Sequence, residues 1–102
     1  MYDLKFEPSF KEDYRKVKKW WSAVTRELRR ALELLEIDGV LPPEYGPHEL
    51  VNTGGNYNGH IDFHLSDGAV DVLVLYKPHK TNPSLRFVRM GRHEDLFRGG
   101  YK

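Results

Sequence analysis

The sequence predicts an α+β fold: an N-terminal strand, then an antiparallel helical hairpin that packs on a mostly antiparallel sheet. Three patterns predict this fold. Apolar residues recur at helical spacing over residues 9–38, alternate with polar residues over 59–65, and form an unbroken run over 72–76. A chain of 102 residues is long enough for one hydrophobic core, so we expect a single domain over residues 1–102.

The N-terminal part of the chain is expected to supply the first strand and the first helix. Residues 2–6 alternate apolar and polar side chains, which is typical of a short strand. The helix is expected to begin at Pro8-Ser9, because Ser9 and Glu12 have the spacing of a capping box. Its apolar stripe consists of Phe10, Tyr14 and Val17.

A second helix follows after a very short connection, which predicts that the two helices run antiparallel. We expect Ser22 to be its N-cap, and Gly39 with the two prolines after it to end it. The adjacent Trp20 and Trp21 are expected to anchor the elbow in the core, and the alternative is that they are platforms on which bases stack. The apolar stripe of this helix consists of Val24, Leu28, Leu32 and Leu35.

Residues 40–58 are expected to form a long loop, because Gly, Pro and Asn recur throughout them. A loop of this length in a small domain is uncommon and tends to carry function, and this one contains His48. The next strand, over residues 59–65, has two unlike faces. One face is apolar, and the other carries His60, Asp62 and His64.

Two further strands complete the predicted sheet. A hairpin turn over residues 66–69 leads into a buried strand over 70–76. Pro78 and Pro83 mark the next turn, after which residues 85–91 form a strand that ends at a glycine. Strands joined by hairpins are usually neighbours, so the three strands of the second half should lie side by side.

The composition is typical of a soluble globular protein, with 39% hydrophobic and 30% charged residues. The N-terminus lacks the basic and apolar regions of a signal peptide, and no apolar run is long enough to cross a bilayer. The sequence contains no cysteine, which excludes disulfides and thiolate metal sites and fits a reducing compartment. We therefore expect a cytoplasmic protein that does not contact a membrane.

The net charge of +1 conceals a strong segregation of charge along the chain. Residues 9–30 contain eight basic and three acidic side chains, residues 31–76 contain eight acidic and no basic ones, and residues 77–102 contain seven basic and two acidic ones. Two basic segments on either side of an acidic one indicate an anionic partner for part of the surface. The candidate contacts on the first helix are Lys11, Arg15, Lys18 and Lys19.

Polar side chains from the second half of the chain are expected to converge on one rim of the sheet. His48 comes from the long loop, His64 from the polar face of its strand, and Asp71 from the start of the next strand. The last strand ends in a glycine turn beside three further groups, Arg89, Arg92 and His93. Two fixed cations beside a titratable imidazole suit the handling of a phosphate.

Three hypotheses fit these residues. Imidazoles could act as general acid and base while Arg89 stabilises charge at phosphorus, which is what metal-free cleavage of RNA needs. Alternatively, His60, Asp62 and His64 could bind a metal from one strand face, although no fourth ligand is identifiable. In the third hypothesis the histidines are surface residues and the domain only binds a partner. Residue spacing alone leaves all three open.

Several short motifs are spread over nearly the whole chain. Those in the first half are Phe10-Lys11-Glu12-Asp13-Tyr14 and Leu41-Pro42-Pro43-Glu44-Tyr45. Those in the second half are His48-Glu49-Leu50, Asn56-Tyr57-Asn58-Gly59, Asp62-Phe63-His64, and Arg89-Met90-Gly91-Arg92-His93 with Leu96-Phe97. In this combination the sequence resembles the YafQ branch of the RelE/ParE toxins. It departs from that family's usual pattern at Val72, where an aromatic residue often stands, and at Ile61, where a basic one often stands.

The resemblance implies a RelE-like, or microbial RNase-like, fold and the toxin of a type II toxin–antitoxin system. Such toxins are ribosome-dependent mRNA endoribonucleases that a small cognate antitoxin neutralises. The implied partners are therefore an antitoxin, the small ribosomal subunit and mRNA, without a cofactor or a metal. The main rival is a catalytically inactive RelE-fold module that binds an antitoxin or RNA without cleaving it.

The resemblance also implies which residues act. The implied catalytic residues are His48, His64, Asp71, His93 and Arg89. The implied substrate contacts are Asp62, Arg92 and Phe97, and the cations of the first helix would face ribosomal RNA. We expect His93 to be the general acid, and either His48 or His64, assisted by Asp71, to be the general base.

Overall fold

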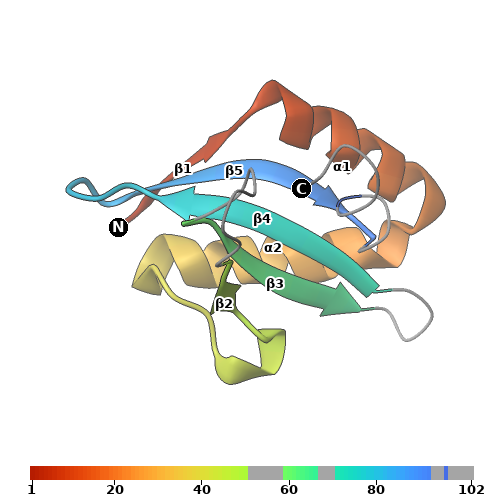
Figure 1. Ribbon diagram of the computed structural model, residues 1–102. Coiled ribbons are helices and arrows are strands. Elements are labelled where there is room, and N and C mark those ends of the chain that lie inside the picture. The colour runs from red at the N-terminus through yellow and green to blue at the C-terminus, as the bar shows by residue number, and fades with distance from the viewer. Residues whose placement is uncertain (51–58, 67–70, 93–95, 97–102) are drawn as a thin grey trace.

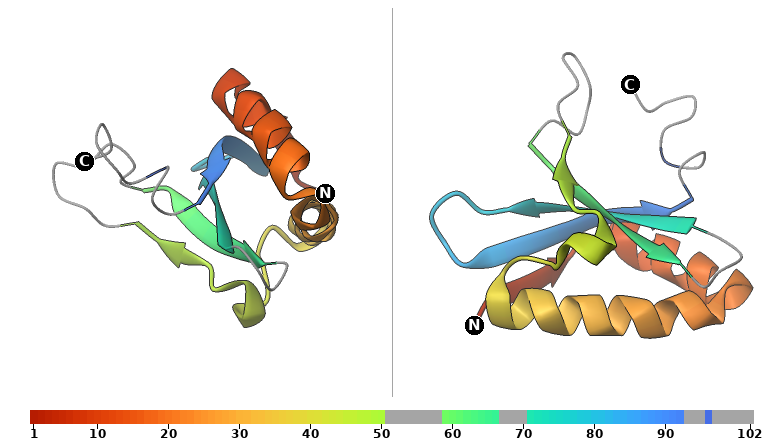
Figure 2. Two further views of the ribbon diagram at one scale, coloured as in Figure 1. Left: turned by 90° about the vertical axis from the view of Figure 1, so that its right-hand side faces the viewer. Right: turned by 90° about the horizontal axis from the view of Figure 1, so that it is seen from below.

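The computed structural model describes residues 1–50, 59–66, 71–92 and 96 of the chain. Two helices lie on one face of a five-stranded sheet, so the predicted α+β architecture is confirmed (Figure 1, Figure 2). No helix in the described ranges is long and apolar enough to cross a membrane. The elements are β1 (Asp3–Phe6), α1 (Pro8–Trp20), α2 (Ser22–Asp38), η1 (Pro43–Tyr45), β2 (His48–Glu49), β3 (Ile61–Ser66), β4 (Asp71–Pro78) and β5 (Ser84–Gly91).

The strands are ordered β1-β5-β4-β3-β2 across the sheet, so the strands of the second half are neighbours as predicted. Strands β2 to β5 pair antiparallel in succession, whereas β1 runs parallel to β5. The register between β4 and β5 shifts where Leu75 pairs with Arg89 and Tyr76 pairs with Phe87. Val88 is therefore an extra residue in β5, and such a bulge bends a strand and re-aims the side chains beyond it.

The hydrophobic core lies between the helices and the sheet. Its aromatic centre is continuous, because Phe87 stacks on Tyr76 with ring centroids 5.4 Å apart and on Phe6 with centroids 5.2 Å apart. Burial raises the pKa of the Tyr76 hydroxyl to about 12. The helices contribute residues predicted from their apolar stripes: Phe10, Val17, Val24, Leu28 and Leu35.

The first helix begins at Pro8, in agreement with the predicted start at Pro8-Ser9, but the capping of both helices differs from the prediction. The second helix begins at Ser22 itself, and no side chain caps either helix. The Ser9 hydroxyl instead donates a hydrogen bond to the carbonyl of Val88 at 2.7 Å. The predicted serine caps are therefore wrong, because each serine lies within the first turn of its helix. The Ser9 hydroxyl instead bonds to the bulged strand β5.

Helix α1 also completes the hydrogen bonding of β5. Strand β1 pairs only with Ser84–Phe87, so the rest of that edge has no strand partner among the described residues. There the Ser9 hydroxyl bonds the Val88 carbonyl, and the Asp13 carboxylate accepts the backbone N–H of Met90 at 3.0 Å. Side chains of α1 thus pair backbone groups that a partly covered edge would leave unsatisfied.

The two helices form the predicted hairpin, with Trp21 as the single residue between them (Figure 1). Trp21 is half-buried and packs against the core, whereas Trp20 is 68% exposed. The expectation of two core anchors is therefore wrong for Trp20. Trp20 is the last residue of α1, whereas the backbone of Trp21 leaves the helical conformation with φ −141° and ψ 66°, so the two adjacent residues do not share one face. At its other end, α2 stops at Gly39 as predicted. Gly39 has φ +75° and lies against the ring of Tyr2.

Residues 40–58 are more ordered than the predicted loop. They contain the short helix η1 and the two-residue strand β2, while residues 51–58 lie outside the described residues. In β2, His48 stands opposite Asp62 of β3. Two residues are too few for a periodic pattern, so only the pairing with β3 reveals this strand.

Candidate active site

Both helices cover one face of the sheet (Figure 2), and the polar residues of β3 alternate with its core residues, so they belong to the opposite face. Strand β3 turns Phe63 and Leu65 into the core, and Asp62 and His64 alternate with them. His64 is exposed, but only 3% of the surface of Asp62 is accessible. A buried carboxylate requires polar partners to offset its lost hydration, so the neighbours of Asp62 are central to the site.

His48 is one of these partners. Its Nδ1 lies 2.9 Å from Oδ1 of Asp62 and 3.3 Å from the carbonyl oxygen of Gly46. Both neighbours are hydrogen-bond acceptors, so we assign the proton to Nδ1 and the lone pair to Nε2. The His48 side chain is 58% exposed. The pair therefore presents an oriented, accessible imidazole whose basic nitrogen is Nε2.

Gly46 contacts the second imidazole of the site as well. A Cβ placed on Gly46 would lie 3.2 Å from Cδ2 of His64, which is closer than side chains normally pack. Gly46 also has φ +60°, a left-handed conformation in which a side chain is strained. Glycine at this position lets one turn lie against His64 while its carbonyl holds His48.

His64 and Asp71 line one hollow of about 630 Å³. Asp71 is exposed and pairs with Ser66, the last residue of β3. It therefore lies beside the same end of β3 as His64. Arg30 of α2 and Tyr45 of η1 also line the hollow, and burial raises the pKa of the Tyr45 hydroxyl. The structure thus brings together the strand imidazole and the carboxylate that the sequence suggested as partners.

The predicted cations lie at the C-terminal end of β5. The Arg89 side chain reaches α1, where its Nε lies 2.6 Å and its Nη2 3.3 Å from the two carboxylate oxygens of Asp13. This bidentate contact fixes both the charge and the orientation of the guanidinium. The guanidinium of Arg92 lies 5.4 Å from the centre of the Trp21 ring, a cation–π contact.

The expected convergence on one rim therefore divides into two groups. The imidazole–carboxylate group, on β2, β3 and β4, consists of His48, Asp62, His64 and Asp71. The guanidinium group, on and just after β5, consists of Arg89 and Arg92. Because β4 lies between β3 and β5, the backbones of β3 and β5 are about 10 Å apart, while Asp71 lies on β4 between them. The predicted residues His93 and Phe97 lie outside the described residues.

Two residues that hold these groups in place were missed in the sequence. Asp13 comes three residues after Phe10 and four before Val17, so it belongs to the buried stripe of α1. An acidic residue on a buried stripe indicates a paired charge, and that pattern could have identified the partner of Arg89. No sequence pattern could have identified Gly46, because its contact with His64 depends on how β2 pairs with β3.

Replacing Asp13 with alanine is expected to lower the free energy of unfolding by about 2 kcal/mol. The change removes the acceptor of the Met90 N–H and the counter-ion of Arg89. Urea unfolding followed by circular dichroism measures the difference. The matched control is Glu12→Ala, an exposed acid on the same helix, for which we expect a change below about 0.5 kcal/mol. Equal losses in the two variants would mean that Asp13 does not hold β5 to α1.

The metal hypothesis concerned His60, Asp62 and His64. Within residues 1–50, 59–66, 71–92 and 96, no three His, Cys, Asp or Glu side chains form a group that could hold a metal ion. Asp62 is instead in contact with His48. Among the described residues, the metal hypothesis therefore lacks the three-ligand group that it requires at β3.

Comparison with known proteins relates nearly the whole chain to one toxin family. The family model described as the bacterial toxin of type II toxin-antitoxin system, YafQ, matches residues 2–98. No curated protein matches the chain in sequence.

Solved structures agree with the family match. The crystal structure of YafQ from E. coli strain BL21(DE3) gives a TM-score of 0.77 at 26% identity, over 95% of this chain and 99% of that chain. The E. coli DinJ-YafQ complex gives 0.76 at 26% identity with the same coverage. A metal-bound toxin from Helicobacter pylori gives 0.73 at 26% identity, over 95% of this chain and all of that one. The chain therefore belongs to the YafQ family of RelE-like toxins from bacterial type II toxin–antitoxin systems.

Proposed function

We propose that this protein is an endoribonuclease that cleaves mRNA on the translating ribosome and so inhibits translation in the cytoplasm. In this proposal residues 1–102 act as one toxin domain, and membership of the YafQ family supports the activity. The observation that carries the proposal is the His48–Asp62 pair, an exposed imidazole held by a buried carboxylate.

The proposed reaction transfers two protons and requires no metal ion. The Nε2 of His48 takes the proton of a ribose 2′-OH, and the 2′-oxygen attacks the adjacent phosphorus. The 5′-oxygen of the next nucleotide leaves with a proton from His93, which yields a 2′,3′-cyclic phosphate and a 5′-hydroxyl. Asp62 is the positioning residue, since it is the carboxylate in contact with His48. In this scheme Asp62 takes the assisting role that the sequence suggested for Asp71.

The remaining residues stabilise charge and bind the RNA. A pentavalent phosphorane carries additional negative charge, which Arg89 and Arg92 would offset. Arg89 is already fixed by its bidentate contact with Asp13, and a charge held in place before the reaction stabilises a transition state most effectively. Phe97 is proposed to stack on a displaced base. His64 and Asp71 would bind the nucleotide from the hollow that they share.

The ribosome would supply the alignment that a few side chains cannot provide. Oriented delivery of the mRNA makes the attack effectively unimolecular, which can account for much of a rate enhancement. Exposed cations of α1 suit ribosomal RNA, because several Lys or Arg contacts to phosphate give strong, salt-dependent attachment. The proposed ribosome contacts are Lys11, Arg15, Lys18 and Lys19.

Cleavage of a defined mRNA with and without programmed ribosomes tests this function. We expect cuts only within the translated region and only on ribosomes, each leaving a cyclic phosphate and a 5′-hydroxyl. Folded protein that binds ribosomes or antitoxin but leaves every message intact would support the alternative, an inactive RelE-fold binding module.

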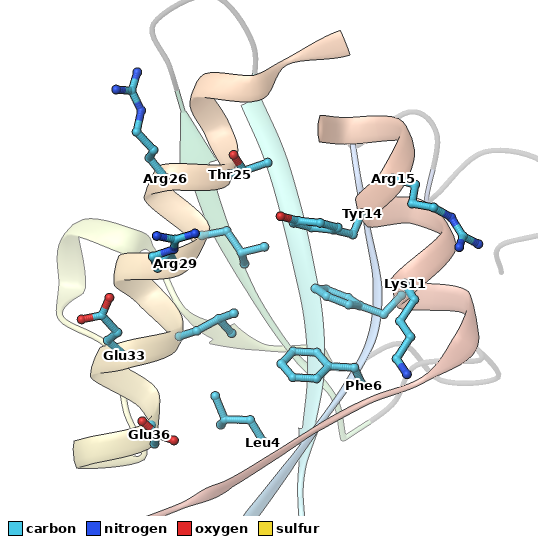
Figure 3. Close-up of a pocket in the computed structure, with 13 residues that line it drawn as sticks. Leu4, Phe6, Lys11, Tyr14, Arg15, Thr25, Arg26, Arg29, Glu33 and Glu36 are labelled. Carbon is cyan, nitrogen blue, oxygen red and sulfur yellow. The ribbon is translucent and has the colours of Figure 1, made fainter. Parts of the chain in front are cut away.

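A cognate antitoxin is the second proposed partner, as E. coli YafQ forms a complex with DinJ. A groove of about 580 Å³ lies between α1, α2 and β1 (Figure 3). Leu4, Phe6 and Tyr14 point into it, and Leu28 and Leu32 line it from α2. An apolar groove beside two helices suits the apolar face of an amphipathic helix. We therefore assign the groove to a helical segment of the antitoxin.

Charged residues along the groove define what the antitoxin helix should carry. The α1 side is basic, with Lys11 and Arg15. The α2 side is basic near the elbow and acidic toward its C-terminal end, with Arg26 and Arg29 followed by Glu33 and Glu36 (Figure 3). A helix that is acidic along most of its polar edge, with a basic residue near the end of α2, complements this pattern.

Charge reversal in the groove, Lys11→Glu with Arg15→Glu, is expected to weaken antitoxin binding by about ten-fold and to flatten its salt dependence. The control is Lys18→Glu with Lys19→Glu, the same charge change on the same helix but outside the groove. This control should weaken ribosome binding while it leaves antitoxin affinity nearly unchanged. Calorimetric titrations with the antitoxin at several salt concentrations measure the effect. Equal losses of antitoxin affinity in both double variants would rule out the groove as its specific site.

A further inference from the structure

A hollow of about 310 Å³ is lined by residues of β1, of β5 and of the turn that joins β4 to β5 (Figure 1). It contains none of the residues assigned to the reaction, to the antitoxin groove or to the ribosome contacts of α1. All of its polar side chains can donate hydrogen bonds, and no carboxylate of the described residues lines it. The polar residues of this hairpin hollow are Lys5, Lys77, His79, Lys80, Ser84 and Arg86.

We propose that the hairpin hollow binds the phosphate backbone of RNA, an inference that rests on the proposed function only in taking RNA as the ligand. Its cations form a row across three strands, because Arg86 of β5 pairs with Lys5 of β1 and with Lys77 of β4. Neighbouring strands are about 4.8 Å apart, so the row spans about 10 Å. Like charges that stand opposite each other destabilise a sheet. The row therefore costs stability in the free protein, and an anion bound along it would remove that cost.

Most of this positive charge has no counter-ion in the part of the chain that the structure describes. The Nε of Arg86 lies 3.6 Å from Oε1 of Glu7, so one carboxylate offsets one cation. Asp3 is the next residue on the same face of β1, but it does not line the hollow and forms no ion pair with a described residue. Three cations have no ion pair within the described ranges, and the proposal rests on them: Lys5, Lys77 and Lys80.

The hairpin turn adds a neutral donor that is held in place before a ligand binds. Nδ1 of His79 accepts hydrogen bonds from the backbone N–H groups of Thr81 at 3.1 Å and of Asn82 at 3.0 Å. Both of these partners are donors, so we assign the ring proton to Nε2. The Nε2–H is therefore the group with which His79 can bind a phosphate oxygen. A preorganised donor beside lysines lowers the cost of ordering the site around an anion.

The extent and the position of the row favour RNA over a single ion or the antitoxin. A row of about 10 Å is longer than one phosphate group, whereas an RNA strand carries a negative charge at every nucleotide. Lys5 alternates along β1 with Leu4 and Phe6, which line the antitoxin groove. The row and the groove therefore lie on opposite faces of the sheet, and a helix seated in the groove does not cover the row.

The row shares a face of the sheet with the proposed reaction centre. Lys77 is two residues from Leu75 on β4, and Leu75 pairs with Asp62 of β3. Residues two apart on a strand face the same side and are separated by about 7 Å. The bound backbone can thus belong to the RNA strand that enters the reaction centre or to ribosomal RNA beside it, and the test distinguishes these two sources.

The test measures the affinity of the full chain for a labelled 2′-O-methyl RNA decamer, which cannot be cleaved, and for vacant ribosomes. Lys5→Gln with Lys77→Gln is expected to weaken binding to one or both about ten-fold at low salt. For the single-stranded decamer, the loss of two phosphate contacts should reduce the slope of log affinity against log salt by about 1.4. A loss on the decamer assigns the row to the strand that is cleaved, and a loss on ribosomes alone assigns it to ribosomal RNA.

Two control variants separate this site from general charge. Lys5→Arg with Lys77→Arg keeps the charge and should retain most of the affinity. Ile37→Glu with Val40→Glu makes the same change in net charge at two exposed positions that line none of the hollows described above. It should weaken binding much less than the glutamine variant, because it leaves the row intact.

Equal losses in the glutamine and glutamate variants would overturn the proposal, as would unchanged binding of both ligands by the glutamine variant. The absence of wild-type binding to either ligand at low salt would overturn it too. A loss of antitoxin affinity without a loss of RNA affinity would also contradict it and make the row a protein interface. Because neither ligand is cleaved in these measurements, a failure of the endoribonuclease proposal leaves the result interpretable.

Discussion

The His48→Ala variant is expected to cleave ribosome-bound mRNA about 100- to 10,000-fold more slowly than the wild type in single turnovers. The change removes the proposed general base, an exposed imidazole that is held by a buried carboxylate. Ribosome affinity should change little, because the exposed cations of α1 are untouched. His48 lies at the surface of the protein, so the variant is expected to fold.

Two controls separate a base from a merely structural residue. Free imidazole should partly restore cleavage by His48→Ala, because the exposed site leaves room for it. The Asp62→Asn variant should also be slow, since its amide can donate to Nδ1 and so favour the tautomer without a basic Nε2. If imidazole gives no rescue, and His64→Ala is the variant whose rate no longer falls at low pH, where a general base becomes protonated, then His64 is the base.

The His93→Ala variant is expected to reduce single-turnover cleavage by a similar factor of about 100 to 10,000, with ribosome affinity little changed. The proposed role of His93 is to protonate the departing 5′-oxygen. It comes two residues after the end of β5 in the sequence, directly after Arg92, whose guanidinium contacts the Trp21 ring. The Arg89→Ala variant should also slow cleavage, by loss of charge stabilisation instead of loss of a proton donor.

A substrate with a 5′-thio leaving group distinguishes these two causes. A thiolate leaves without protonation, so His93→Ala should cleave the thio substrate almost as fast as the wild type does. Arg89→Ala should remain slow on both substrates, since the phosphorane carries its charge in either case. If His93→Ala cleaves the thio substrate as poorly as the normal one, His93 positions the RNA and is not the acid.

The sequence by itself determined the elements whose residues interact with near neighbours in the chain. Helical stripes such as Phe10 and Val17 and the alternation around Phe63 are local patterns, and each predicts which side of one element is buried. The hairpin order of the last three strands followed from short turns. The candidate site residues were also proposed from the sequence, through the resemblance that its short motifs carry, and their roles stay predictions.

Only the tertiary structure decided which of those residues meet. Sequence patterns could not assign Asp62 to His48, because a two-residue strand is defined by its pairing and not by its own periodicity. The contact of Asp13 with Arg89 joins residues 76 positions apart, across a helix and a bulged strand. The exposure of Trp20 was likewise decided at the elbow, where one indole of an adjacent pair faces the core. The physical reason is common to all three: contacts between distant segments depend on register and on the angle at which elements pack, which a local pattern does not contain.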